Sequence, residues 1–164
     1  MKPCELEWLA TQASGAQLIA EVGCWQGRST RALADNTRGA VFAIDHFQGV
    51  PELLYLLADK PPHWLFKTFM MNLMDCDNLV VVRQRSREAA RLLDPLRFDF
   101  IFLDGDHNYQ AVVDDIRWWK PMVKPGGLLA GHDYRDAPGV EQAVLEFLPQ
   151  AKLVEGTQLW SIRL

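Results

Sequence analysis

Two short apolar runs in the second half of the chain each end in side chains that can accept protons or bind cations. Residues 100–103 are followed by the sequence DGDH at 104–107, and residues 128–130 are followed by GHD at 131–133. Short apolar runs beside glycine or proline are typical of buried parallel strands, and ligands of open α/β sheets bind outside the carboxyl ends of such strands. We therefore expect carboxylates and imidazoles from two strand ends to meet at one edge of a sheet.

The elements that hold these residues alternate along the chain. After an opening helix over 5–13, strands are expected over 18–22, 40–45, 79–82, 98–103 and 127–130, and helices over 28–36, 63–74, 86–93, 109–119 and 140–147. Strands and helices that alternate in this way favour a parallel sheet with helices on both faces. Segments 152–155 and 158–162 are joined by a turn too short for a crossover, so they predict an antiparallel C-terminal hairpin.

Composition limits the class of protein. The 164 residues are 49% hydrophobic, which fits one domain spanning residues 1–164. A formal net charge of -4, without a long run of lysine or arginine, argues against a nucleic-acid partner. The absence of an apolar span of about 18 residues and of a signal-peptide pattern predicts a cytoplasmic protein with no membrane partner. Cys4, Cys24 and Cys76 are odd in number and widely spaced, which argues against a disulfide framework.

The link over residues 46–62 is the one irregular region. It is rich in proline and followed by aromatic residues and methionines. Three interpretations stay open: a flexible apolar cap over a substrate, a surface helix packed on the sheet, and a contact of a homodimer.

The loop after the first expected strand has the pattern acidic-x-Gly-x-x-x-Gly and opens a helix. Gly23 and Gly27 let backbone amides approach a ligand closely, and Glu21 can accept hydrogen bonds from an ammonium group. The loop lacks the G-x-G-x-x-G of dinucleotide-binding proteins, which disfavours a nicotinamide oxidoreductase. It resembles motif I of S-adenosylmethionine-dependent methyltransferases, although an ordinary glycine-rich turn is the alternative.

Other residues lie where they can contact the same cofactor. Asp45 ends the second expected strand about 20 residues after the glycine loop, the position at which a carboxylate binds ribose hydroxyls. Capping of the next segment is its alternative role. Ser86 either caps the helix after the third strand or offers its hydroxyl or amide to an adenine. Ser29 and His46, beside these positions, complete the predicted cofactor set.

The DGDH and GHD sequences resemble those of small methyltransferases related to sugar O-methyltransferases and cephalosporin-hydroxylase-like proteins, and the resemblance extends over nearly the whole chain from Glu21. It implies a Rossmann-like fold with seven strands and S-adenosylmethionine as cofactor. By the same resemblance, Asp104, His132 and Asp133 bind a divalent metal, most simply magnesium, and Asp104 also contacts the cofactor. His107 then takes the position of the general base.

This arrangement suits methyl transfer to a hydroxyl of a small metabolite, such as a sugar or natural product. A hydroxyl is a poor nucleophile until it loses its proton, and a divalent cation lowers its pKa and orients the oxygen. The imidazole of His107 can accept the proton at neutral pH. Two other functions stay open: a methyltransferase that needs no metal, and a non-catalytic protein that binds S-adenosylmethionine.

Simpler structural roles also exist for these side chains. His107 can cap the helix that begins near Tyr109, and His132 with Asp133 can hold a turn together without metal. Asp114 and Asp115 are expected on a solvated helix face, and the tryptophans at 118 and 119 in the core.

Overall fold

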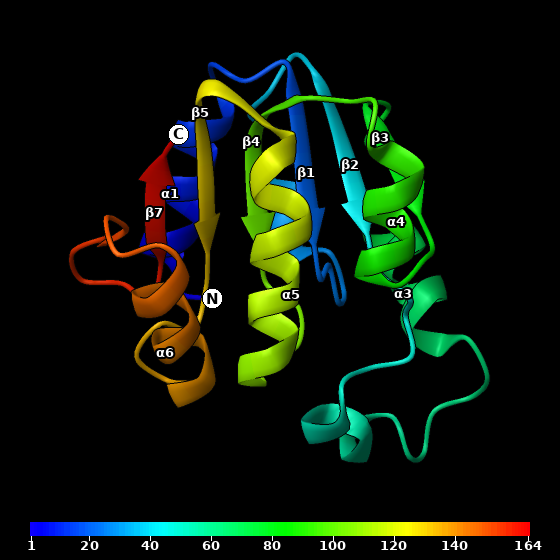
Figure 1. Cartoon of the computed structure of the whole chain (residues 1–164). Coiled ribbons are helices and arrows are strands. Elements are labelled where there is room, and N and C mark those ends of the chain that lie inside the picture. The colour runs from blue at the N-terminus through cyan, green and yellow to red at the C-terminus, as the bar shows by residue number, and fades with distance from the viewer.

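A seven-stranded sheet forms the centre of the chain in a computed structural model, which describes residues 1–164 apart from the side chains of residues 51–53. The strand order is β3-β2-β1-β4-β5-β7-β6 (Figure 1). The strands are β1 (Leu18–Val22), β2 (Ala40–Ile44), β3 (Leu79–Val82), β4 (Phe98–Leu103), β5 (Val123–Gly131), β6 (Lys152–Leu153) and β7 (Trp160–Arg163).

Five strands run parallel and the C-terminal pair reverses direction. β1 pairs in parallel with β2 and β4, β3 joins β2, and β5 joins β4. β7 is antiparallel to both β5 and β6. The predicted fold, a mostly parallel Rossmann-like sheet with an antiparallel C-terminal hairpin, is therefore confirmed.

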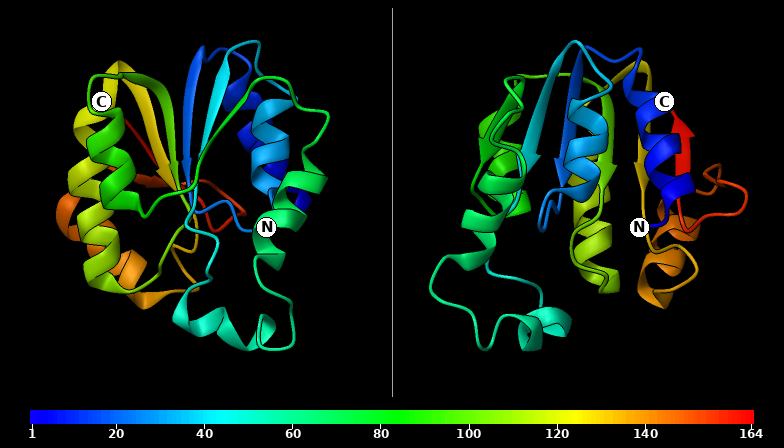
Figure 2. Two further views of the ribbon diagram at one scale, coloured as in Figure 1. Left: turned by 90° about the vertical axis from the view of Figure 1, so that its right-hand side faces the viewer. Right: turned by 180° about the vertical axis from the view of Figure 1, so that it is seen from behind.

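Helices cover both faces of the sheet (Figure 2). The helices are α1 (Pro3–Ala13), α2 (Arg28–Ala34), α3 (Trp64–Asn72), α4 (Ser86–Leu93), α5 (Tyr109–Trp119) and α6 (Pro138–Phe147), with short 3-10 turns η1 (Pro51–Leu56) and η2 (Lys120–Met122). Side chains of α4, α5 and α6 share one core cluster, and α1 and α2 contribute to another. Among the helices that the structure describes, none combines the length and apolar character needed to cross a bilayer.

β4 shows how one strand serves both cores. Ile101 packs with α4, α5 and α6, whereas its neighbours Phe100 and Phe102 pack with α1 and α2. All three side chains are at most 1% exposed, because successive side chains of a strand point to opposite faces and both faces are covered. β4 is therefore buried between two cores and paired on both sides up to Leu103, and the residues that follow it lie at the edge of the sheet.

The segment between β2 and α3 lies beyond the carboxyl ends of the strands (Figures 1 and 2). Leu54, Tyr55 and Leu56 of η1 are 50%, 72% and 42% exposed, so these three residues do not pack on the sheet. α3 itself buries Leu65 and Phe69 in a third apolar cluster beside the glycine loop. Whether the segment caps a substrate or contacts a second copy stays a prediction.

Candidate functional site

A pocket of about 730 Å³ lies where β1, β2 and β4 end. Most of the predicted site residues line it: Gly23, Ser29, Asp45, His46, Ser86, Asp104, His107, His132 and Asp133. Parallel strands place their carboxyl ends at one edge of the sheet, and this common edge brings together residues up to 110 positions apart. The volume is typical of a site for a cofactor and a small ligand.

The glycine loop is pressed against the end of β4. Gly23 has a φ of +91°, and a Cβ at this position would lie 2.1 Å from the carbonyl oxygen of Asp104. The Gly23 amide donates to the Ile44 carbonyl at 2.9 Å. Only glycine combines this conformation with this close approach, so the loop follows one path along the pocket wall.

Asp45 holds the same loop from the end of β2. Its Oδ2 accepts hydrogen bonds from the amides of Cys24 and Trp25 at 3.0 and 2.9 Å. Its Oδ1 accepts from the amide of Phe47 at 2.6 Å. Asp45 therefore fixes the backbone of the glycine loop and also lines the pocket. Its carboxylate oxygens can accept further hydrogen bonds from a ligand.

Two residues of the predicted cofactor set, Glu21 and Gly27, are not among the residues that line the pocket. Gly27 is the N-cap of α2 with a φ of +88°, and a Cβ there would lie 2.7 Å from Leu73 Cδ1. Glu21 is fully buried behind the loop, where Thr30 Oγ1 donates to its Oε2 at 2.5 Å. Its Oε1 has no hydrogen-bond partner among the described residues, and burial raises the pKa of Glu21 to about 7.

The raised pKa of Glu21 predicts a pH-dependent effect of Glu21→Gln on stability. The unfolded chain ionises Glu21 near its ordinary value of 4.5, whereas the folded chain resists ionisation up to about 7. Wild-type stability therefore falls as pH rises through this window, and a neutral glutamine avoids the loss. We expect the free energy of unfolding of E21Q to exceed that of wild type by about 1–3 kcal/mol more at pH 8 than at pH 5. Urea denaturation at both pH values measures this; an equal difference at both would contradict it.

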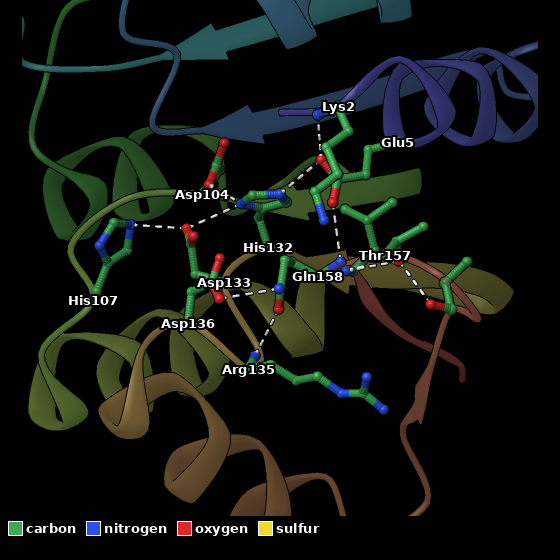
Figure 3. Close-up of polar contacts among 12 residues, drawn as sticks. Lys2, Glu5, Asp104, His107, His132, Asp133, Arg135, Asp136, Thr157 and Gln158 are labelled. Carbon is green, nitrogen blue, oxygen red and sulfur yellow. Dashed lines mark hydrogen bonds and ion pairs between the residues drawn. The ribbon is translucent and has the colours of Figure 1, made fainter.

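Two carboxylates and two imidazoles meet at the ends of β4 and β5 (Figure 3). Asp133 Oδ2 lies 3.0 Å from His107 Nε2 and 3.1 Å from His132 Nδ1. His132 Nδ1 also lies 3.8 Å from Asp104 Oδ1. One donor atom each of Asp104, His107 and Asp133 lies within 4.8 Å of the others, so this group can hold a metal ion. In this group His107 stands where the sequence predicted His132, and His132 lies beside the group through contacts of its Nδ1 with Asp133 and Asp104.

Burial and mutual charge shift the pKa values of this group. Burial raises the pKa of Asp104 to about 7. Burial opposes ionisation of Asp133 as well, but hydrogen bonds from His107 and His132 outweigh it and hold the pKa of Asp133 well below its usual range. The hydrogen bond to Asp133 raises the pKa of His107. Burial lowers the pKa of His132, yet Asp133 and Asp104 more than compensate and raise it to about 9. Perturbed groups gathered in a pocket are typical of an active site.

Backbone strain marks the same place. Asp133 has a φ of +61°, a conformation that few residues other than glycine adopt. Its carbonyl oxygen accepts a hydrogen bond from the amide of Ala137, the N-cap of α6, at 3.0 Å. The left-handed turn aims the Asp133 carboxylate between the two imidazoles. His107 therefore points to Asp133, and Asn108, not His107, is the N-cap of α5.

Glu5 joins this group from α1, and the sequence analysis missed it (Figure 3). The residue is 1% exposed, and its Oε2 lies 3.2 Å from His132 Nε2. A glutamate in the first turn of a helix reads as an ordinary capping residue, so its pattern carries no signal of a site.

The network around Ser86 corrects two predictions. Ser86 is the first residue of α4 and Arg85 is its N-cap, so the predicted N-cap role of Ser86 is wrong. The Ser86 hydroxyl donates to Asp115 Oδ1 and accepts from Trp119 Nε1. Asp115 is 7% exposed, so its predicted place on a solvated helix face is also wrong, and burial raises its pKa to about 7. The apolar stripe of α5 could have shown this, because Asp115 lies one turn from the buried Val112.

Comparison with known proteins shows the family of the chain. A family model described as a methyltransferase domain matches residues 20–134, more than half of the chain. The chain belongs to this methyltransferase family. The family predicted from the sequence motifs is therefore confirmed. An uncharacterised protein of Acanthamoeba polyphaga mimivirus is 28% identical over 130 residues, which are 76% of this chain and 56% of that protein, so this methyltransferase chain spans about half of its relative.

Solved methyltransferases share the fold. An O-methyltransferase of Bacillus cereus in complex with S-adenosylhomocysteine matches with a TM-score of 0.71 at 17% identity, covering 100% of this chain and 82% of that one. TomG of Streptomyces achromogenes, an O-methyltransferase of tomaymycin synthesis bound to S-adenosylmethionine, matches with 0.72 at 15% identity over 100% and 80%. A calicheamicin methyltransferase matches with 0.70 at 17% identity over 98% and 77%. These similarities show the methyltransferase fold.

Proposed function

We propose that this methyltransferase domain transfers a methyl group from S-adenosylmethionine to a hydroxyl of a small metabolite, such as a sugar or natural product, with the help of a divalent metal. The observation that carries the proposal is the meeting of two carboxylates and two imidazoles, Asp104, Asp133, His107 and His132, at the edge of the pocket that the Gly23 loop lines. Two structural neighbours support it: an O-methyltransferase bound to S-adenosylhomocysteine, and an O-methyltransferase involved in tomaymycin synthesis bound to S-adenosylmethionine.

The glycine loop, Asp45 and Ser86 are the proposed cofactor contacts. Gly23 lets the loop lie against the end of β4 along the pocket wall, and Asp45 holds the neighbouring amides in place. The Ser86 hydroxyl already donates to Asp115, so the Ser86 amide in the first turn of α4 is the donor left for an adenine. S-adenosylmethionine supplies the electrophilic methyl group when it is bound.

The donors in the pocket fit a divalent cation. Asp104 and Asp133, with the His132 imidazole beside them, form a donor set that suits Mg²⁺ or Mn²⁺, because hard oxygen ligands dominate. A bound cation lowers the pKa of a hydroxyl and orients its oxygen. Asp104 and Asp133 hold the cation in this proposal, because both carboxylates face His132 Nδ1 and lie within reach of one another.

His107 is the proposed general base. Its side chain is 34% exposed toward the pocket, three times the 11% of His132, so an acceptor hydroxyl can reach it. The hydroxyl proton moves to His107, the oxygen forms a bond to the methyl carbon, and the carbon–sulfur bond breaks to leave S-adenosylhomocysteine. Asp133 stabilises the imidazolium that results.

A panel of hydroxylated metabolites, incubated with S-adenosylmethionine and Mg²⁺, tests the proposal through formation of S-adenosylhomocysteine. We expect turnover that falls by at least about 100-fold on addition of EDTA and returns with excess Mg²⁺, since the metal supplies several kcal/mol of stabilisation to the developing oxyanion. Turnover unaffected by EDTA would favour a metal-independent methyltransferase. Cofactor binding without turnover on any acceptor would favour a non-catalytic binding protein.

A further inference from the structure

The contact between α1 and the end of β5 carries an inference that rests on the proposed metal-assisted function and deepens it. Glu5 is the third residue of α1 and is 1% exposed. His132 follows β5, and its Nε2 is buried with no other contact among the described side chains than the Glu5 carboxylate at 3.2 Å. The distance between His132 Nε2 and Glu5 Oε2 is that of an ion pair, although the geometry of the contact is not that of a well-aligned hydrogen bond.

The opposite side of the ring faces the proposed metal ligands. His132 Nδ1 lies 3.1 Å from Asp133 Oδ2 and 3.8 Å from Asp104 Oδ1. A metal binds a ring nitrogen only through its lone pair, so a proton on Nδ1 must leave when a cation binds there, whereas a proton on Nε2 can stay. A carboxylate at Nε2 holds the proton there and leaves the lone pair on Nδ1.

Glu5 is itself held firmly, so it can orient the ring. Its Oε2 accepts from the Lys2 amide at 2.5 Å, and its Oε1 accepts from the Gln158 amide at 3.0 Å. These backbone bonds lower the pKa of Glu5 although burial opposes ionisation. Both carboxylate oxygens therefore face donors, and α1 and the segment before β7 fix the group from two sides.

We propose that Glu5 is a positioning residue that orients His132 and keeps the proton on Nε2, so that Nδ1 is presented to the divalent cation held by Asp104 and Asp133. This assigns His132 as the imidazole ligand and leaves His107 as the base, although His107 also lies within 4.8 Å of the two carboxylates. His107 has no carboxylate contact at its other nitrogen among the described residues and stays free to accept a proton.

Glu5→Gln tests the inference because a glutamine cannot face donors with both ends. Its amide group must oppose either the Gln158 amide or the Lys2 amide and the ring proton. Calorimetric titration of the protein with Mn²⁺ alone is expected to show an affinity about 10–100-fold lower for E5Q than for wild type. Glu7→Gln on the exposed side of the same helix removes the same charge and should change the affinity less than about twofold.

A measurement on the wild-type protein keeps the inference testable if E5Q does not fold. Zn²⁺ is diamagnetic, so ¹⁵N-histidine NMR of the Zn²⁺-loaded protein shows which nitrogen of each ring carries a proton, with His132→Asn to assign the signals. We expect a proton on His132 Nε2 and metal on Nδ1, and no metal on the ring of His107.

The outcomes separate the inference from the proposed function. Equal Mn²⁺ affinity of folded E5Q and wild type, or metal on His107 in place of His132, would overturn the role of Glu5 and leave metal-assisted methyl transfer standing. Failure of the wild-type protein to bind either Mn²⁺ or Zn²⁺ would overturn both. A lower melting temperature of E5Q with unchanged metal affinity would show that Glu5 only anchors α1.

Discussion

Asp133→Asn is expected to lower kcat/KM by about 10²–10³-fold, because it removes the carboxylate that both imidazoles share and that the proposed metal requires. Asparagine suits this position, since it tolerates the φ of +61° and keeps the size of the side chain. The loss therefore reports the charge and not a distorted turn. Steady-state kinetics with an acceptor found in the screen measures the effect.

Asp136→Asn is the matched control for this variant. Asp136 lies three residues further along and contacts Gln158 Nε2 at 3.0 Å, outside the lining of the pocket. An amide oxygen can still accept that hydrogen bond, so D136N should keep activity within about twofold. Both variants should bind S-adenosylmethionine within about threefold of wild type. If D133N kept more than half of the wild-type kcat/KM, the proposed metal role of Asp133 would be wrong.

Gly23→Ala is expected to abolish measurable cofactor binding. It should also lower the free energy of unfolding by more than the roughly 1–3 kcal/mol that a single strained residue costs. The new Cβ would lie 2.1 Å from the Asp104 carbonyl oxygen, and φ is +91°. The loop must then leave the end of β4, and the amides held by Asp45 move with it. Chemical denaturation and calorimetry with S-adenosylmethionine measure the two effects.

Two other glycines separate the causes of this loss. Gly156 also has a positive φ of +75°, but nothing lies within 4 Å of the added Cβ, so G156A should cost only the backbone strain of about 1 kcal/mol. Gly15 has open space and no positive φ, so G15A should change stability by less than about 1 kcal/mol. A G23A protein as stable as G15A would contradict the close approach that the structure shows.

Much of the fold follows from local patterns in the sequence. β1, β3, α4 and α5 lie within a residue of their predicted bounds, because an apolar run with turn residues at its ends or a 3.6-residue stripe is a property of a short segment. β5 is longer than predicted, since it begins at Val123 and pairs with β4 across an irregular register. The sequence does not predict this extension, because proline and glycine near the start of β5 are unusual inside a strand.

The residues that reach the edge of the sheet follow from local sequence: Asp45, Asp104, His132 and Asp133 each come after an apolar run that predicts a strand. What those side chains face depends on the assembled fold. Glu5 contacts His132, and it also accepts from the Gln158 amide, 153 positions away in the chain. Asp115 is buried where its carboxylate accepts from Ser86 of another helix. A periodic pattern reports which face of an element is buried, whereas the partner on that face depends on contacts between distant segments, and these form only when the sheet assembles.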